Sequence, residues 1–93
     1  MNAFTKGEVM TVVTFKTKTE VFEFLQYAKG FGIKGSIVPL PKEIKIGCGL
    51  CVKIAYGDAY KCYALIAENY FPTFNGIYTL KKVGGKTVLA KNY

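Results

Sequence analysis

The chain has 93 residues, of which 51% are hydrophobic and 20% are charged, a composition that can supply one packed core and is too apolar for a disordered chain. All 13 basic residues are lysines, and histidine, arginine and tryptophan are absent. Without histidine the usual general base and the commonest metal ligand are missing, and without arginine there is no bidentate group for phosphate or guanine. The composition therefore argues against acid–base catalysis, phosphoryl transfer and base-specific reading of nucleic acid.

The first ten residues lack the pattern of a signal peptide, because Lys6 and Glu8 interrupt any apolar stretch. We expect residues 1–10 to be a disordered tail or a cloning remnant, and residues 11–93 to form a single domain. No uncharged apolar run approaches the roughly 18 residues that cross a bilayer. Three cysteines, an odd number, are typical of reduced thiols rather than a disulfide framework. These features favour a cytoplasmic location.

The net charge of +7 does not by itself identify a partner. The lysines are spread from Lys6 to Lys91, and the only adjacent pair is Lys81-Lys82. Such a distribution is typical of a lysine-coated surface. We therefore expect no membrane interaction, and nucleic-acid binding is a minority hypothesis.

The first predicted strand is residues 11–15, a short β-branched and aromatic run. Thr17 and Glu20 follow at the spacing of a capping box, in which the threonine hydroxyl caps a helix and the glutamate reaches back. Apolar residues then recur at helical spacing as far as Lys29. Gly30 is expected to stop this helix in the left-handed conformation.

Two further strands are predicted at residues 35–40 and 50–55, joined by a polar connection. Pro39 and Pro41 cannot donate to a ladder, so the earlier strand ends there or has an open side. The later strand alternates, which is typical of a strand with one covered face. One face would carry Leu50, Val52 and Ile54, and the other Cys51, Lys53 and Ala55.

A second helix is predicted to start with Asp58 as its N-cap and to end before Pro72. Its apolar stripe would consist of Ala59, Cys62, Tyr63, Ile66, Ala67 and Tyr70. Residues 77–83 are predicted to form a fourth strand, and Gly84-Gly85 a hairpin turn into residues 87–90. This order predicts an α+β fold, and specifically a ferredoxin-like βαββαβ sandwich with an added C-terminal β-hairpin strand. Two helices on one face of the sheet would leave the other for solvent, a partner or a subunit.

Cys48 is the most distinctive reactive group, because Gly47 and Gly49 flank it and leave space around an exposed sulfur. Lys45 and Lys53 are near in sequence, and a nearby ammonium group stabilises a thiolate. These residues suit a nucleophilic or sulfur-carrying cysteine. The alternative is that Cys48 is a small hydrophobic residue beside a β-bulge, and the residues alone leave both interpretations open.

The other two cysteines have simpler explanations. Cys51 completes a C-x-x-C spacing with Cys48, but it alternates onto the opposite strand face, so a disulfide would require the loop to bend. Cys62 lies on the apolar stripe of the second helix and is expected in the core. Three cysteines without histidine fall one ligand short of a zinc site. We therefore predict no metal and no cofactor.

Residues 38–54, followed by a helix and by Asn75-Gly-Ile-Tyr78, resemble the small bacterial family of putative selenium/sulfur (Se/S) carrier protein-like sequences. The similarity rests on the Pro41-Lys-Glu43 run, on Cys48-Gly-Leu50 before a strand, and on the late Gly-Ile-Tyr strand, and it covers roughly residues 11 to 80. The resemblance implies that Cys48 carries sulfur or selenium as a persulfide or perselenide. Lys42 stands where arginine is common in the family, and Cys51 is an additional cysteine that could act as a resolving thiol.

The first hypothesis is accordingly a sulfur or selenium carrier rather than a turnover enzyme, with donor and acceptor proteins as partners. Cys48 would bear the atom, while Gly47, Gly49, Lys45 and Lys53 would give access and stabilise the thiolate. The alternative is a non-catalytic ferredoxin-like module that forms a homodimer through the open sheet face or binds a ligand. A third hypothesis, nucleic-acid binding, would show steeply salt-dependent affinity.

Overall fold

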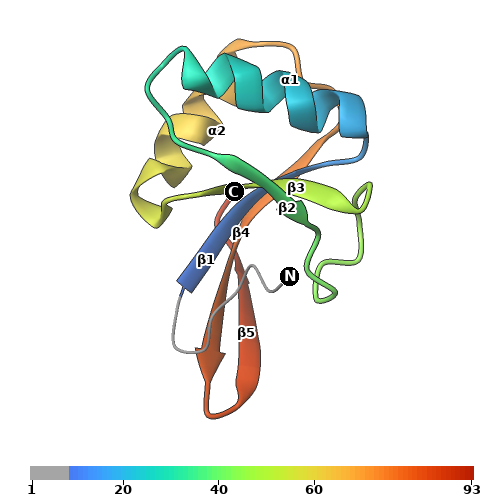
Figure 1. Ribbon diagram of the computed structural model, residues 1–93, viewed down its shortest axis with the longest axis vertical. Helices are drawn as coiled ribbons and strands as arrows, with labels where there is room; N and C mark the ends of the chain where they lie inside the picture. Colours follow the sequence, from blue (N-terminus) through green and yellow to red (C-terminus); the bar gives the residue numbers. More distant parts are fainter. Residues whose placement is uncertain (1–8) are drawn as a thin grey trace.

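Within residues 9–93, five strands form one antiparallel sheet, and two helices pack on one of its faces (Figure 1). The computed structural model describes residues 9–93. The elements are β1 Val9–Phe15, α1 Lys18–Lys29, β2 Ser36–Pro39, β3 Leu50–Ile54, a short 3-10 helix η1 Tyr56–Asp58, α2 Ala59–Glu68, β4 Phe74–Val83 and β5 Lys86–Lys91. The predicted α+β class is therefore confirmed, with each predicted strand and helix present.

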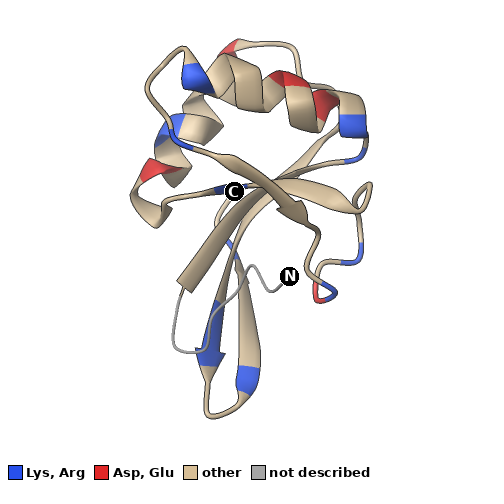
Figure 2. Ribbon diagram, viewed as in Figure 1, with Lys and Arg blue, Asp and Glu red and all other residues tan. Residues whose placement is uncertain are grey.

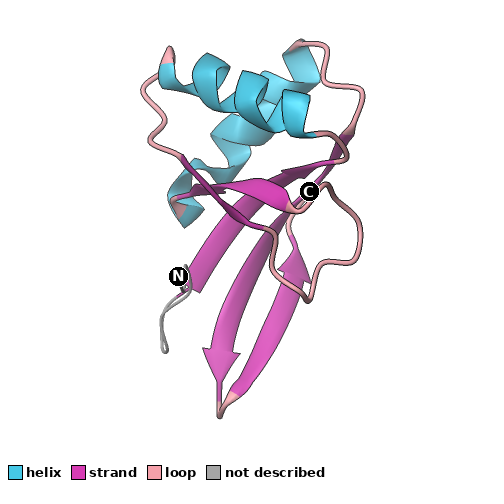
Figure 3. Ribbon diagram, turned by 45° about the vertical axis from the view of Figure 1, so that its right-hand side comes forward, coloured by secondary structure: helices cyan, strands magenta, loops and turns pink. Residues whose placement is uncertain are grey.

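The strand order is β2-β3-β1-β4-β5, so β1 lies in the centre and pairs with β3 and β4. The added strand β5 pairs only with β4 and extends the sheet beyond a simple βαββαβ unit. The β4–β5 ribbon projects away from the two helices (Figure 3). Within residues 9–93 no helix has the length and apolar character needed to span a bilayer.

The principal core lies between the helices and the sheet. Phe15 is at its centre, with ring centroids 5.5 Å from Phe24, 5.8 Å from Phe71 and 5.9 Å from Phe74. Cys62 of α2 is fully buried in this core, which confirms its predicted position. This cluster, called the first core below, joins α1 and α2 to β1, β3 and β4.

A second, smaller core lies on the other side of the sheet. Because strand side chains alternate between faces, the neighbours of the first-core residues point away from the helices. The second core consists of Met10, Val12, Val38, Ile44, Cys51 and Leu80, with Leu40 and Tyr78 packed against it. The expectation that β3 has only one covered face is therefore wrong, since Cys51 is as buried as Val52. The β2–β3 loop covers part of this face through Leu40 and Ile44.

The start of α1 follows the sequence prediction only in part. The Thr17 hydroxyl accepts a hydrogen bond from the Glu20 backbone N–H at 3.3 Å, as an N-cap should. The Glu20 carboxylate instead accepts from the Thr73 N–H at 3.0 Å, so it ties α1 to the segment before β4. At the other end, Gly30 has right-handed φ and ψ, and the positive φ falls at Gly32. The predicted left-handed stop is thus displaced by two residues.

The second helix differs more from the sequence prediction than the first. Asp58 is the N-cap residue of α2, as predicted, but it is also the last residue of η1 and makes no side-chain cap hydrogen bond. The buried face of α2 is Ala59, Cys62, Leu65 and Ile66. Tyr63 and Ala67, predicted on that face, are exposed. Tyr70 lies beyond the helix and is 87% exposed. Leu65 lies on the buried face of α2, although the predicted stripe omits it.

The C-terminal hairpin forms as predicted. Val83 pairs with Lys86, and both glycines of the Gly84-Gly85 turn have positive φ, which is the geometry of a two-residue hairpin turn. At the N-terminus, residues 1–8 of the predicted tail lie outside the described residues. Val9 and Met10, which were assigned to that tail, are instead the first two residues of β1, and Met10 is buried in the second core.

Candidate functional site

Cys48 lies in the β2–β3 loop, at the end of the sheet where β1 also ends. The loop leaves β2 after Pro39 and returns through Gly49 into β3. The Leu40 N–H donates to the Gly49 carbonyl at 2.9 Å, which closes the base of the loop. Gly49 has φ +92°, a region that glycine enters far more readily than other residues. The glycine after Cys48 is therefore required by the chain reversal.

The loop is held to the protein rather than free. Ile44 is buried in the second core, and its N–H donates to the Pro41 carbonyl at 3.0 Å. A side chain at position 47 would begin 2.7 Å from Leu40 Cδ2, so the loop backbone passes directly over that leucine. The segment that carries Cys48 is thus anchored on the second core by its apolar side chains.

The Cys48 side chain is half-buried, whereas the sequence analysis expected it to be exposed. It packs against the first core, and its S–H donates to the Leu50 carbonyl at 3.4 Å. The sulfur therefore lies on the helix-facing side of the sheet, beside Leu50 and Val52, as strand alternation predicts. Only part of this thiol is open to a reaction partner.

The other two thiols are fully buried. Cys51 points into the second core and donates to the Pro39 carbonyl at 3.8 Å. Burial, followed by the charge on Cys48, raises the pKa of Cys51 to about 12. Burial is also the main cause that raises the pKa of Cys62 to about 12, with a smaller contribution from Asp58 that the charge of Lys61 opposes. Both groups are neutral thiols at physiological pH.

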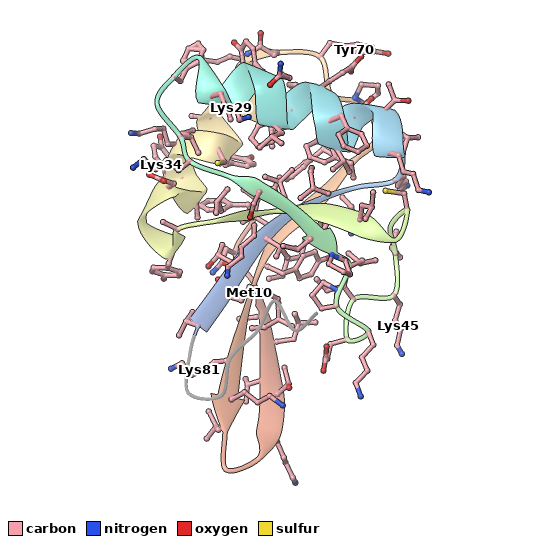
Figure 4. All side chains as sticks on the ribbon, viewed as in Figure 1. Met10, Lys29, Lys34, Lys45, Tyr70 and Lys81 are labelled. Carbon is pink, nitrogen blue, oxygen red and sulfur yellow. The ribbon has the colours of Figure 1, made fainter. Side chains whose placement is uncertain are left out.

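The structure brings some predicted site residues together and separates others. Gly47, Gly49 and Lys45 share the loop with Cys48. Lys45 is exposed and extends outward from it (Figure 4). Lys53 lies on the opposite sheet face from Leu50 and three residues farther along β3, which is about 10 Å of strand. Lys53 instead lines a cavity of about 400 Å³ together with Lys34 and Tyr56.

The basic residues are not gathered on one face. Figure 2 shows them on the loops, on both helices and along the β4–β5 ribbon. Within residues 9–93, no cluster of three or more His, Cys, Asp or Glu side chains is arranged to hold a metal ion.

One residue of the site was not singled out by sequence reasoning. Asn75 of β4 directs its Nδ2 atom to the carbonyl of Ile46 in the Cys48 loop, at 3.3 Å. The same nitrogen lies 3.2 Å from Thr14 Oγ1 and 3.4 Å from the Tyr78 hydroxyl. Asn75 occurs in the Asn-Gly-Ile-Tyr run of the family resemblance, but no sequence pattern connects it with the loop 29 residues earlier.

A family model described as Putative Se/S carrier protein-like matches residues 10–79, which include the Cys48 loop and Asn75. No curated protein matches the chain, and no solved structure matches it.

Proposed function

Because the chain belongs to the Putative Se/S carrier protein-like family, we propose that it carries sulfur or selenium as a persulfide or perselenide on Cys48. The observation that carries this proposal is the contrast among the three cysteines. Cys51 and Cys62 are fully buried, whereas Cys48 is half-buried on a surface loop. A donor or acceptor protein can therefore approach only Cys48 without unfolding the core.

The transfer step follows ordinary thiol exchange. Cys48 loses its proton to solvent, and the thiolate attacks the outer sulfur of a donor persulfide. A bond forms between Sγ and that sulfur, the donor S–S bond breaks, and the donor cysteine leaves as a thiolate with the electron pair. That thiolate regains a proton from solvent, so neither an oxidant nor a reductant is consumed. Perselenide transfer proceeds in the same way, with selenium as the atom attacked.

The loop geometry sets one requirement for this step. In the structure, the Cys48 S–H donates a hydrogen bond to the Leu50 carbonyl. A persulfide has no hydrogen on Sγ, so loading must replace this contact, and the side chain must turn from Leu50 toward solvent. Lys45 is an exposed residue of the same loop, and we assign it the role of stabilising the thiolate.

Three finer assignments belong to this proposal. The sheet order supports a ferredoxin-like arrangement extended by β5. A reducing compartment such as the cytoplasm would keep Cys48 available as a thiol. Cys51 is a candidate resolving thiol, but its burial requires the loop and β3 to separate before it could attack a Cys48 adduct.

The test is loading by a cysteine desulfurase supplied with cysteine, followed by intact-protein and peptide mass spectrometry. We expect the mass of one sulfur atom to be added at Cys48 and the adduct to be absent in C48S. Loading should persist in C62A, a matched control that removes a buried thiol. A glutathione selenopersulfide, used in a parallel reaction, determines whether selenium is accepted.

Alkylation of the same protein tests whether Cys48 is the accessible thiol. Iodoacetamide should label Cys48 before Cys51 and Cys62, because both buried thiols are protonated at neutral pH. Loading that survives C48S, or equal labelling of all three cysteines in the folded protein, would contradict the assignment of the carrier residue.

A second candidate function, a non-catalytic ligand-binding module, is favoured by one observation. A cavity of about 420 Å³ lies beside the β4–β5 ribbon, away from Cys48. Its lining residues are Val9, Tyr56, Thr79, Lys81, Ala90 and Asn92. This alternative predicts a Cys48 that does not load, together with a compound that protects the protein from thermal unfolding.

A further inference from the structure

Asn75 occupies an irregular position in the sheet. Thr14 of β1 pairs with Gly76 of β4, whereas the next residue, Phe15, pairs with Phe74. Asn75 is therefore the extra residue of a β-bulge on β4. A bulge leaves one residue outside the ladder and turns its side chain away from the regular alternation. Here the turned side chain points to the Cys48 loop.

The hydrogen bonds fix which atom of the Asn75 amide faces the loop. The Ile46 carbonyl can only accept a hydrogen bond, so the Asn75 group opposite it must be the Nδ2 amide NH2 and not the side-chain oxygen Oδ1. The Thr14 hydroxyl donates its own hydrogen to the Gly76 carbonyl at 2.8 Å, which leaves its oxygen to accept from Asn75. Thr14 is fully buried. The amide thus connects a rigid point on the central strand to the loop.

The segment that Asn75 reaches has little else to hold it by side-chain packing. Ile44 is buried and Cys48 is half-buried, but the three residues between them are exposed, and Ile46 is 54% exposed. The hydrogen bond from Asn75 to the Ile46 carbonyl therefore ties this exposed segment to β4. Asn75 holds the carbonyl two residues before Cys48.

We propose that Asn75 is a positioning residue that holds the Cys48 loop, and so the thiol, in the half-buried geometry seen here. Its purpose in sulfur transfer rests on the proposed function, but its effect on the accessibility of Cys48 does not. Loss of the amide donor frees residues 45–47 from β4. The Cys48 side chain then leaves the first core and the Leu50 carbonyl more often.

The test measures the rate at which iodoacetamide alkylates Cys48 in the full chain, with Cys62 as an internal reference. N75A removes the amide, and N75D keeps its shape but cannot donate. Both variants should alkylate Cys48 faster by about 2- to 12-fold, the range that corresponds to the net contribution of one hydrogen bond. Hydrogen exchange should become faster at the amides of residues 44–48 and stay unchanged in α2.

Asn69 provides a matched control. Its Nδ2 donates to the Leu65 carbonyl at 2.7 Å at the end of α2, so N69A and N69D make the same chemical changes away from the loop. They should leave the alkylation rate of Cys48 unchanged. Y78F, which removes another acceptor of the Asn75 amide and keeps the bond to the loop, should also leave this rate unchanged.

Two results would overturn the inference. One is an unchanged Cys48 rate in both Asn75 variants. The other is a parallel rise for Cys62, which would mean that the whole protein has loosened. The outcome is separable from the carrier function, because alkylation needs no sulfur donor. If C48S abolishes loading but the Asn75 variants alkylate Cys48 at the normal rate, the carrier proposal stands and the positioning role falls. If the Asn75 variants alkylate Cys48 faster but C48S still loads, the positioning role stands and the carrier proposal falls.

Discussion

At the scale of single residues, Gly49 is a position where the backbone conformation, and not side-chain packing, favours glycine. Its φ is +92°, and outside residues 48–50 no heavy atom of the described chain lies within 4 Å of the place where a Cβ would stand. An alanine there would meet no steric obstacle beyond its own backbone. Any cost of substitution must therefore come from the positive φ, which is unfavourable for residues with a Cβ.

We expect G49A to lower the free energy of unfolding by about 1–2 kcal/mol. The variant should also change the rate of Cys48 alkylation, because the strained turn directly follows the thiol. Gly57 in η1 is the matched control, since it also has open space around the Cβ position but lacks a positive φ. G57A should be neutral or stabilising by up to about 1 kcal/mol. Urea unfolding of the two variants measures the difference, and equal stabilities would show that φ at position 49 is not limiting.

The site could be predicted from sequence only where its signal is local. Cys48 between two glycines is visible in three consecutive residues, and strand alternation correctly placed Cys48 and Cys51 on different faces. The half-burial of Cys48 was not predictable, because it depends on how the loop packs on the first core. The contribution of Asn75 depends on a bulge between strands about 60 residues apart, and no periodicity reveals that register.

At the scale of elements, the two helix starts differ in how they satisfy their free backbone N–H groups. The Thr17 hydroxyl accepts from the Glu20 N–H at the start of α1. At α2 the Asp58 side chain makes no such bond, and the 3-10 turn η1, closed by the Asp58 N–H donating to the Ala55 carbonyl, leads directly into the helix. Two residues that both favour the N-cap position thus make different contacts at their helices.

T17A should therefore destabilise the protein by about 1 kcal/mol. D58A should change stability by less than about 0.5 kcal/mol, the usual range for a surface change without a special contact. Thermal unfolding can resolve these values, because 1 kcal/mol shifts the midpoint of a domain this size by about 4–8 °C. A D58A variant as unstable as T17A would mean that Asp58 stabilises α2 by a route other than a side-chain hydrogen bond.

The elements themselves were predictable because strong periodic patterns and turn residues coincide. The Gly84-Gly85 turn and the β-branched run at residues 11–15 are examples, and both are present. The predictions failed where tertiary contacts decide the outcome. The Glu20 carboxylate bonds to Thr73, a residue distant in sequence, instead of completing the capping box. Likewise, Leu65 is buried because the face of α2 that contacts the first core includes it.

At the scale of the whole molecule, two cores on opposite faces of one sheet share a common feature. Each contains a buried thiol, Cys62 in the first core and Cys51 in the second. The β2–β3 loop takes part in both, through Cys48 on the first and Ile44 on the second. Movement of this loop during sulfur transfer would therefore affect packing on both faces, which favours a small displacement of Cys48 over a large opening of the loop.

The two buried thiols also make global stability depend on alkaline pH. Their pKa is about 12 in the folded protein and 9.0 in the ordinary, unfolded-like state. Above pH 9 the unfolded chain loses these protons while the folded protein keeps them. The contribution of the two thiols to the free energy of unfolding is therefore fully present below pH 9 and is lost as the pH rises toward 12. Each thiol can contribute a loss of up to about 1.4 kcal/mol per pH unit in this window.

We therefore expect the free energy of unfolding to fall between pH 8 and pH 10 by roughly 1–3 kcal/mol more in the native chain than in a C51A/C62A variant. The comparison uses the change with pH in each protein, so the cavities left by the substitutions and the titration of lysines and tyrosines common to both largely cancel. Urea unfolding under reducing conditions provides the measurement. If both proteins lose the same stability over this interval, the buried thiols ionise no less readily in the folded state than in the unfolded chain, and burial then does not protect Cys51 and Cys62 from reaction.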